Sequence, residues 1–187
     1  MIRHKVFISY HHTDKDEAYK LEFERKTQNI IMSQAVQFGD YSNDLSDEYV
    51  KRLIREDKIS NSTVVIVLIG AETYKRKHVD WEIYAGLTDK AKGHSGLIGI
   101  LLPTYYSSFE NYNLAGKGFN KDTLPARFYD NLKTGYAKLY TWQEAFQRVN
   151  FRNYNIQNWI EDAFWRKDNQ PDKINNSRLQ LEYNLVF

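Results

Sequence analysis

Runs of apolar residues, separated by amphipathic stretches, set the pattern of this chain. Three runs are apolar at successive positions, as in strands buried on both faces of a parallel sheet: 5–10 (KVFISY), 62–70 (STVVIVLIG) and 96–103 (GLIGILLP). Residues 35–40 (AVQFGD) alternate between apolar and polar, as an outer strand would, and 137–142 (AKLYTW) fit an edge strand late in the chain.

Helical patterns lie between these strands. Thr13 is placed to cap a helix that runs from Asp14 to about Met32, and Ser46 to cap a second. Further helical patterns surround Glu82 and cover 125–133 and 154–167. Alternating strands and helices predict an α/β fold with right-handed crossovers, a three-layer sandwich around a five-stranded parallel sheet. We expect the flavodoxin-like strand order 2-1-3-4-5.

The length predicts one domain over residues 1–187, since single domains commonly contain about 100–200 residues. Within it, residues 104–124 form a long polar insertion that contains glycine, and loops of that length are usually functional or mobile. The tail, 170–187, ends in the apolar stretch LEYNLVF, which indicates packing on the domain or on a partner.

The charge and the amino-acid composition limit the kinds of partner that this protein can bind. The net charge of +2 supplies no general attraction for nucleic acid or for an anionic membrane. Cysteine is absent, so disulfides, thiolate zinc sites and cysteine nucleophiles are excluded. The N-terminus is too short and too polar for a signal peptide, and no 18-residue apolar run occurs. We therefore expect a cytoplasmic protein.

One helix places an acid beside its apolar face. Val79, Ile83 and Leu87 recur every four residues, and Glu82 sits one position away from that stripe. Two interpretations follow from this position. Glu82 is either a boundary residue that reaches water or a carboxylate that the fold holds at a ligand pocket.

The predicted topology brings several polar side chains together. In an open parallel sheet, ligands bind beyond the carboxyl ends of the strands, where the strand order reverses. That point lies between the strands that end near residues 10 and 70. Hydroxyls, an aromatic ring and a carboxylate converge there and can bind a ribose and stack on its base; the residues are Ser9, Tyr10, His11, Asp40, Tyr41, Ser42 and Glu82.

Several other chemistries lack their motifs. The chain contains no GxGxxG, no GxxxxGK[ST] and no GxSxG, which argues against a Rossmann dinucleotide site, a P-loop and an α/β-hydrolase. His11 and His12 are adjacent and lack HExxH spacing, so we expect no metal. A phosphoacceptor receiver domain would need acidic residues after the first and third strands, where this chain has Ser-Tyr and Ile-Gly.

The motifs FISY, DYS, VIVLIG and V-x-x-E-I occur in this order at compatible spacing. In this the chain resembles the TIR-like family of bacterial and archaeal proteins, and within it the TIR-like proteins of the Thoeris antiphage system. The resemblance covers residues 4–103, and the chain after Pro103 matches only loosely.

The resemblance implies a flavodoxin-like fold and cleavage of NAD at the nicotinamide–ribose bond, with NAD as substrate and no cofactor. The catalytic glutamate of such enzymes lies in a W-x-x-x-E-like context on the helix after the third strand. Glu82 takes that place, His78 stands where a tryptophan is usual, and Trp81 is expected at the substrate. The product would be a cyclic or modified ADP-ribose, a diffusible signal for a separate effector protein.

Two further functions stay open at this point. Many TIR domains act by self-association, so a non-catalytic interaction module, forming a homo-oligomer, is one alternative. A nucleoside-modifying enzyme that ignores NAD is the other. Release of nicotinamide from NAD separates both from the NAD-cleaving enzyme.

Overall fold

The computed structural model describes residues 3–33, 57–89, 93–108, 118–149 and 154–186. Its strands are β1 (His4–Ser9), β2 (Ile31–Ser33), β3 (Val64–Ile69), β4 (Gly96–Leu101) and β5 (Ala137–Thr141). Its α-helices are α1 (Asp14–Thr27), α3 (Lys77–Leu87), α4 (Pro103–Ser108), α5 (Ala126–Thr134), α6 (Trp142–Ala145) and α7 (Asn155–Asn169). Short 3-10 helices cover Thr73–Lys75, Lys121–Thr123 and Pro171–Lys173, and residues 57–60 are helical.

The strands form one sheet in the order β2-β1-β3-β4-β5, and each neighbouring pair is parallel. This confirms the predicted flavodoxin-like order. The central strands are the three apolar runs, as predicted, and every residue of β3 and β4 is buried. A strand in the middle of a three-layer fold meets apolar helices on both faces, so both of its faces must be apolar.

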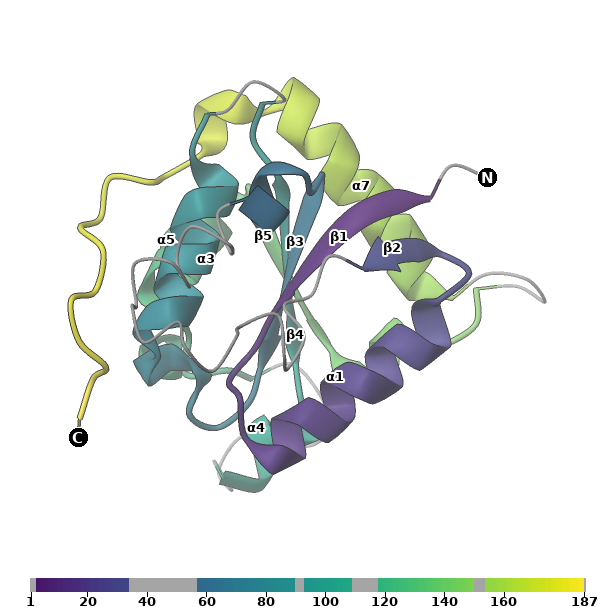
Figure 1. Cartoon of the computed structure of the whole chain (residues 1–187), viewed down its shortest axis with the longest axis horizontal. Coiled ribbons are helices and arrows are strands. Elements are labelled where there is room, and N and C mark those ends of the chain that lie inside the picture. Colours follow the sequence, from purple (N-terminus) through teal and green to yellow (C-terminus); the bar gives the residue numbers. More distant parts are fainter. Residues whose placement is uncertain (1–2, 34–56, 90–92, 109–117, 150–153, 187) are drawn as a thin grey trace, which may run out of the picture.

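Helices cover the sheet on both sides (Figure 1). On one face, alternate residues of β3 pack with α1 and α7, through Ile66, Leu68, Phe23 and Ile156. On the other face, the intervening residues pack with α3 and α5, through Val65, Val67, Ile83 and Phe128. The two hydrophobic clusters follow from the period of two along a strand.

The first helix is shorter than predicted. It ends at Thr27, and the expected continuation to Met32 is wrong because the chain turns there, with the Ile30 amide donating to the Thr27 carbonyl at 2.7 Å. Ile31 is buried and pairs with His4, so the apolar residues at the end of the helical pattern belong to the edge strand β2. The predicted strand 35–40 and most of the helix predicted after Ser46 lie outside the described residues.

The predicted insertion, 104–124, begins as a helix. Helix α4 starts at Pro103, a residue that favours the first turn, and contains the fully buried Tyr105. The Tyr105 hydroxyl and Thr123 Oγ1 form a hydrogen bond of 2.6 Å. The two described ends of the insertion are therefore tied to each other and to the core.

The tail packs on the domain, which was one of the two expected outcomes. In Figure 1 it runs beside α3 and α5, as the yellow end of the chain. Asn131 Nδ2 on α5 donates to the Asn175 carbonyl at 2.7 Å. At the start of α3, the Lys77 amide donates to Asn184 Oδ1 at 3.0 Å, and the Leu185 amide donates to the Lys75 carbonyl at 2.9 Å.

Candidate active site

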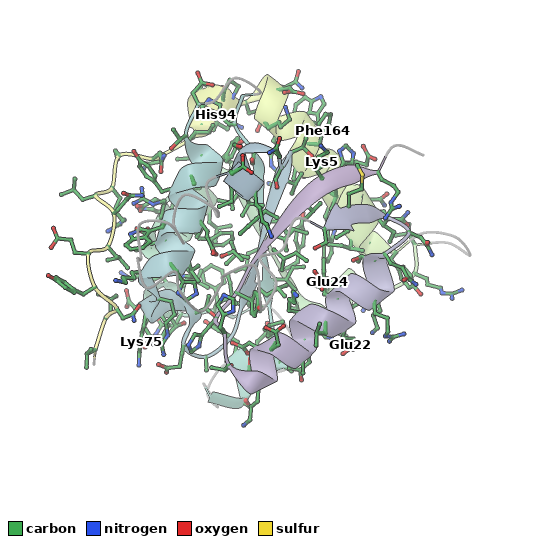
Figure 2. The ribbon with its side chains drawn as sticks, in the orientation of Figure 1. Lys5, Glu22, Glu24, Lys75, His94 and Phe164 are labelled. Atoms are coloured by element: carbon green, nitrogen blue, oxygen red, sulfur yellow. The ribbon has the colours of Figure 1, made fainter. Side chains whose placement is uncertain are left out.

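The candidate site lies at the edge where the parallel strands end. Figure 2 labels Lys75 at this edge, and Lys5 and His94 at the opposite one. Ser9 is the last residue of β1, and its hydroxyl donates a 2.5 Å hydrogen bond to Glu82 Oε2 on α3. Ser9 is 1% exposed and Glu82 is 3% exposed. Glu82 is therefore an inward-facing carboxylate, and its interpretation as a boundary residue in water is wrong.

The sequence of α3 explains why an acid faces inward. Val79 and Ile83 are fully buried against the sheet, and Glu82 follows Val79 by three residues, so it shares that face. Gly86 lets the helix approach closely, because a Cβ there would lie 2.8 Å from Val65 Cγ2. This close packing brings the Glu82 carboxylate to the end of β1.

Tyr10 lies on the other face of the sheet from Ser9. Its ring belongs to the hydrophobic cluster under α1, and its hydroxyl donates to the Glu17 carboxylate of α1. Burial raises the pKa of Tyr10 far above its ordinary value, and the Glu17 bond and the Glu17 and Glu82 charges raise it further. The hydroxyl therefore stays protonated, and it donates to α1, away from the Ser9–Glu82 pair.

Three histidines gather around the segment that follows β1. The His78 Nε2 atom lies 3.1 Å from the Tyr10 carbonyl oxygen, and the His12 ring lies 4.3 Å from the Tyr10 ring and 5.3 Å from the His78 ring. His78, at the position where a tryptophan was expected, thus ties the start of α3 to the end of β1. No motif predicted this grouping, since His11 and His12 are 66 or more positions away from His78 along the chain.

His11 is half-buried and lines a cavity of about 390 Å³ together with Asp16, Glu72 and Thr104. Burial lowers the pKa of His11 to about 4, and the Arg76 charge contributes in the same direction, whereas Glu72 opposes it. His11 is therefore neutral at pH 7. Ser9 and Glu82 are not among the described residues that line this cavity.

The lowered pKa of His11 predicts that the folded state loses stability in acid. The folded state holds its imidazole with a pKa of about 4 against an ordinary 6.5, so between these values the unfolded chain binds more protons. Stability should therefore fall as the pH drops from about 6.5 toward 4. Between these pH values, the free energy of unfolding of His11→Gln should fall by about 1–2 kcal/mol less than that of the wild type. This figure allows for screening by water at the partly exposed ring. Urea unfolding at pH 7 and pH 4.5 measures this, and equal losses would contradict it.

Trp81 points toward the tail. Its indole Nε1 donates to the Leu181 carbonyl at 2.8 Å, and Lys77 Nζ lies 5.0 Å from the centre of its ring. Successive side chains on a helix diverge by about 100°, so Trp81 and Glu82 leave α3 in different directions. The structure thus does not bring Trp81 together with Ser9 and Glu82.

The neighbouring acid, Asp80, was not among the residues that the sequence predicted to be important. It is buried and forms two hydrogen-bonded contacts with the fully buried Arg127 of α5: Nε to Oδ1 at 2.9 Å and Nη2 to Oδ2 at 3.2 Å. The Leu181 amide also donates to Asp80 Oδ2 at 3.0 Å. The Asp80–Arg127 pair and the tail therefore both bind the side of α3 that faces away from the sheet. We call these contacts the clamp on α3.

The remaining predicted site residues, Asp40, Tyr41 and Ser42, lie outside the described residues. The part of the chain that the structure describes holds no group of three or more His, Cys, Asp or Glu residues arranged for a metal ion. Within the same residues, no helix combines the length and the apolar composition needed to cross a membrane.

A five-stranded parallel sheet in the order 2-1-3-4-5, with polar groups at the strand ends, defines the flavodoxin-like class of α/β proteins. Comparison with family models narrows the class. The model described as "Thoeris protein ThsB, TIR-like domain" matches residues 7–107, more than half of the chain, and this span includes Ser9, His11 and Glu82. The chain therefore belongs to this TIR-like family of the Thoeris antiphage defence system. A search of curated proteins found no match.

Proposed function

We propose that the protein cleaves NAD at the nicotinamide–ribose bond and releases a cyclic or modified ADP-ribose as a second messenger in antiphage defence. The observation that carries the proposal is the buried Glu82 carboxylate, hydrogen-bonded by Ser9 at the carboxyl ends of β1 and β3. Open α/β sheets bind their ligands at this switch point. Membership of the Thoeris TIR-like family supports the biological setting.

The chemistry suits a fixed carboxylate. When the bond between the ribosyl carbon and the pyridinium nitrogen breaks, the electron pair leaves with the ring, and nicotinamide departs as a neutral molecule. No general acid is needed, and positive charge develops on the ribosyl centre. A preorganised carboxylate stabilises that charge, most strongly where water is excluded and the local dielectric constant is low. In this proposal Glu82 has that role, and Ser9 orients one of its oxygens.

Capture of the ribosyl cation decides the product. Water would add and lose a proton, giving ADP-ribose, whereas a nucleophile within the same molecule would give a cyclic isomer. Either product can diffuse to a separate effector protein, which we propose as the downstream partner. No cofactor is required, since NAD itself supplies the leaving group and the ribosyl centre.

The test combines purified protein with infected cells. We expect nicotinamide release from NAD in vitro, and an ADP-ribose-type nucleotide in phage-infected cells that express the wild type but not in cells that express Glu82→Gln. Chromatography and mass spectrometry of the nucleotide pool detect both. If neither purified protein nor infected cells form nicotinamide and the nucleotide, the proposal fails and the non-catalytic interaction module becomes the better explanation.

A further inference from the structure

The cavity beside His11 lies between the start of α1, the segment after β3 and the helix α4. Its volume of about 390 Å³ falls at the lower end of the range for small-molecule sites, which is about 300–1,000 Å³. Its polar lining includes side chains with unused hydrogen-bonding capacity, and these define what could bind.

Asp16 forms a buried acceptor in this cavity. It is 3% exposed, and Thr104 Oγ1 donates to its Oδ1 atom at 2.8 Å. None of the described residues donates a hydrogen bond to Oδ2. The carboxylate also depends on Gly70, because a Cβ there would lie 2.5 Å from Oδ2. Burial raises the pKa of Asp16, and the Thr104 bond offsets part of that rise. The Oδ2 atom can accept hydrogen bonds from a ligand with hydroxyl donors.

His11 contributes a second polar group to the lining. Its Nδ1 atom is buried and has no hydrogen-bond partner among the described residues. Native proteins rarely leave a buried polar atom unpaired, so each case needs an explanation such as a ligand or a water. The neutral imidazole can accept or donate one hydrogen bond through this atom. Its ring also offers a flat face on which a base can stack.

The buried Asp16 carboxylate disfavours a phosphate-centred ligand in this cavity. Glu72 is paired with Lys75 at 3.0 Å and with Arg76 at 3.6 Å, whereas Asp16 forms no ion pair with any of the described residues. This arrangement favours a neutral or cationic ligand with several hydroxyl donors. A ribose cis-diol meets that requirement, because one carboxylate can accept from both hydroxyls, as acidic residues do in other α/β nucleotide sites.

We propose that this cavity binds a ribonucleoside, with the ribose cis-diol donating to Asp16 and the base lying against His11. The proposal goes beyond NAD cleavage, because Ser9 and Glu82 do not line the cavity among the described residues, and it does not depend on that reaction. It assigns a second binding site at the same edge of the sheet.

Adenosine is the probe for the test, with an NMR titration of the full-length, 15N-labelled protein as the measurement. We expect shifts at the amides of His11, Ala71 and Thr104, and a binding constant from their saturation. The probe 2′,3′-dideoxyadenosine lacks the diol and should bind at least about tenfold more weakly, since hydrogen bonds to charged groups are the stronger ones. Asp16→Asn keeps the Thr104 acceptor and should weaken adenosine by about 10–100-fold.

Asp168→Asn is the matched control, because it makes the same chemical change on the half-exposed end of α7. It should bind adenosine like the wild type. Ala71→Leu fills the cavity without altering Asp16 and should abolish binding, which keeps the test decisive if Asp16→Asn folds poorly. Equal affinity for adenosine and its dideoxy analogue, shifts confined to other faces, or undiminished binding by Ala71→Leu would each overturn the proposal.

Discussion

Replacing Arg127 with leucine should lower the free energy of unfolding by about 3–5 kcal/mol, because the change leaves a buried carboxylate without its counter-ion. Asp80 is 4% exposed, and its carboxylate accepts hydrogen bonds from both Nε and Nη2 of Arg127. The same guanidinium holds the tail, through Asn176 Oδ1 at 2.9 Å and the Leu179 carbonyl at 3.2 Å. Leucine replaces neither the charge nor these hydrogen bonds.

Urea unfolding followed by circular dichroism at pH 7 measures this loss. Lys133→Ala is the control on the same helix, since its ammonium is more than half exposed and its pair with Asp130 should contribute at most about 1 kcal/mol. Adding Asp80→Leu to Arg127→Leu removes the orphaned charge, so the double variant should regain part of the stability. An Arg127→Leu protein within about 1 kcal/mol of the wild type would show that the pair matters little.

Glu82→Gln should reduce NAD turnover by roughly 100-fold or more, if Glu82 stabilises the ribosyl cation as proposed. Glutamine keeps the volume, and its amide oxygen can still accept the hydrogen bond from Ser9. Only the charge is lost. The free energy of unfolding should therefore change by no more than about 1 kcal/mol, so the loss of activity would not reflect loss of folded protein.

Initial rates of nicotinamide release at saturating NAD test this expectation. Glu22→Gln supplies the control, because it removes a partly exposed carboxylate from α1 that pairs with Lys26 (Figure 2 labels Glu22). Its rate should equal that of the wild type. Undiminished release by a folded Glu82→Gln protein would remove Glu82 from the reaction.

The sequence predicted the central sheet well and its edge poorly, for a physical reason. The strands β1, β3 and β4 are buried on both faces, and this leaves an uninterrupted apolar run. The described part of β2 has three residues, of which Ile31 alone is buried, so its pattern resembles the end of the preceding helix. A short edge strand carries too few buried positions to show a period of its own.

The candidate site divides in the same way. Topology alone brought Ser9 and Glu82 to one edge of the sheet, because both follow from strand order. Strand order does not tell in which direction each side chain points. In the structure the Tyr10 side chain points to α1, and the Trp81 side chain points to the tail. Asp80 and Arg127 are 47 positions apart, and isolated charged residues suggest a solvated surface. No local pattern could have revealed that they meet inside the protein.

The contacts of the clamp on α3 extend beyond the residues that identify the family, since Asp80 is bound by Arg127 and Leu181. The inner face of this helix is completed by β3, within the matched residues 7–107, but Asp80 finds a hydrogen bond from Leu181, 101 positions later. A fragment trimmed to the family boundary would keep every residue that identifies it and lose β5, α5 and the counter-ion of Asp80. Expression designs, domain dissections and affinity tags should therefore leave residues 170–186 intact, because Leu181 and Leu185 hydrogen-bond to Asp80 and Lys75 at the helix that carries Glu82.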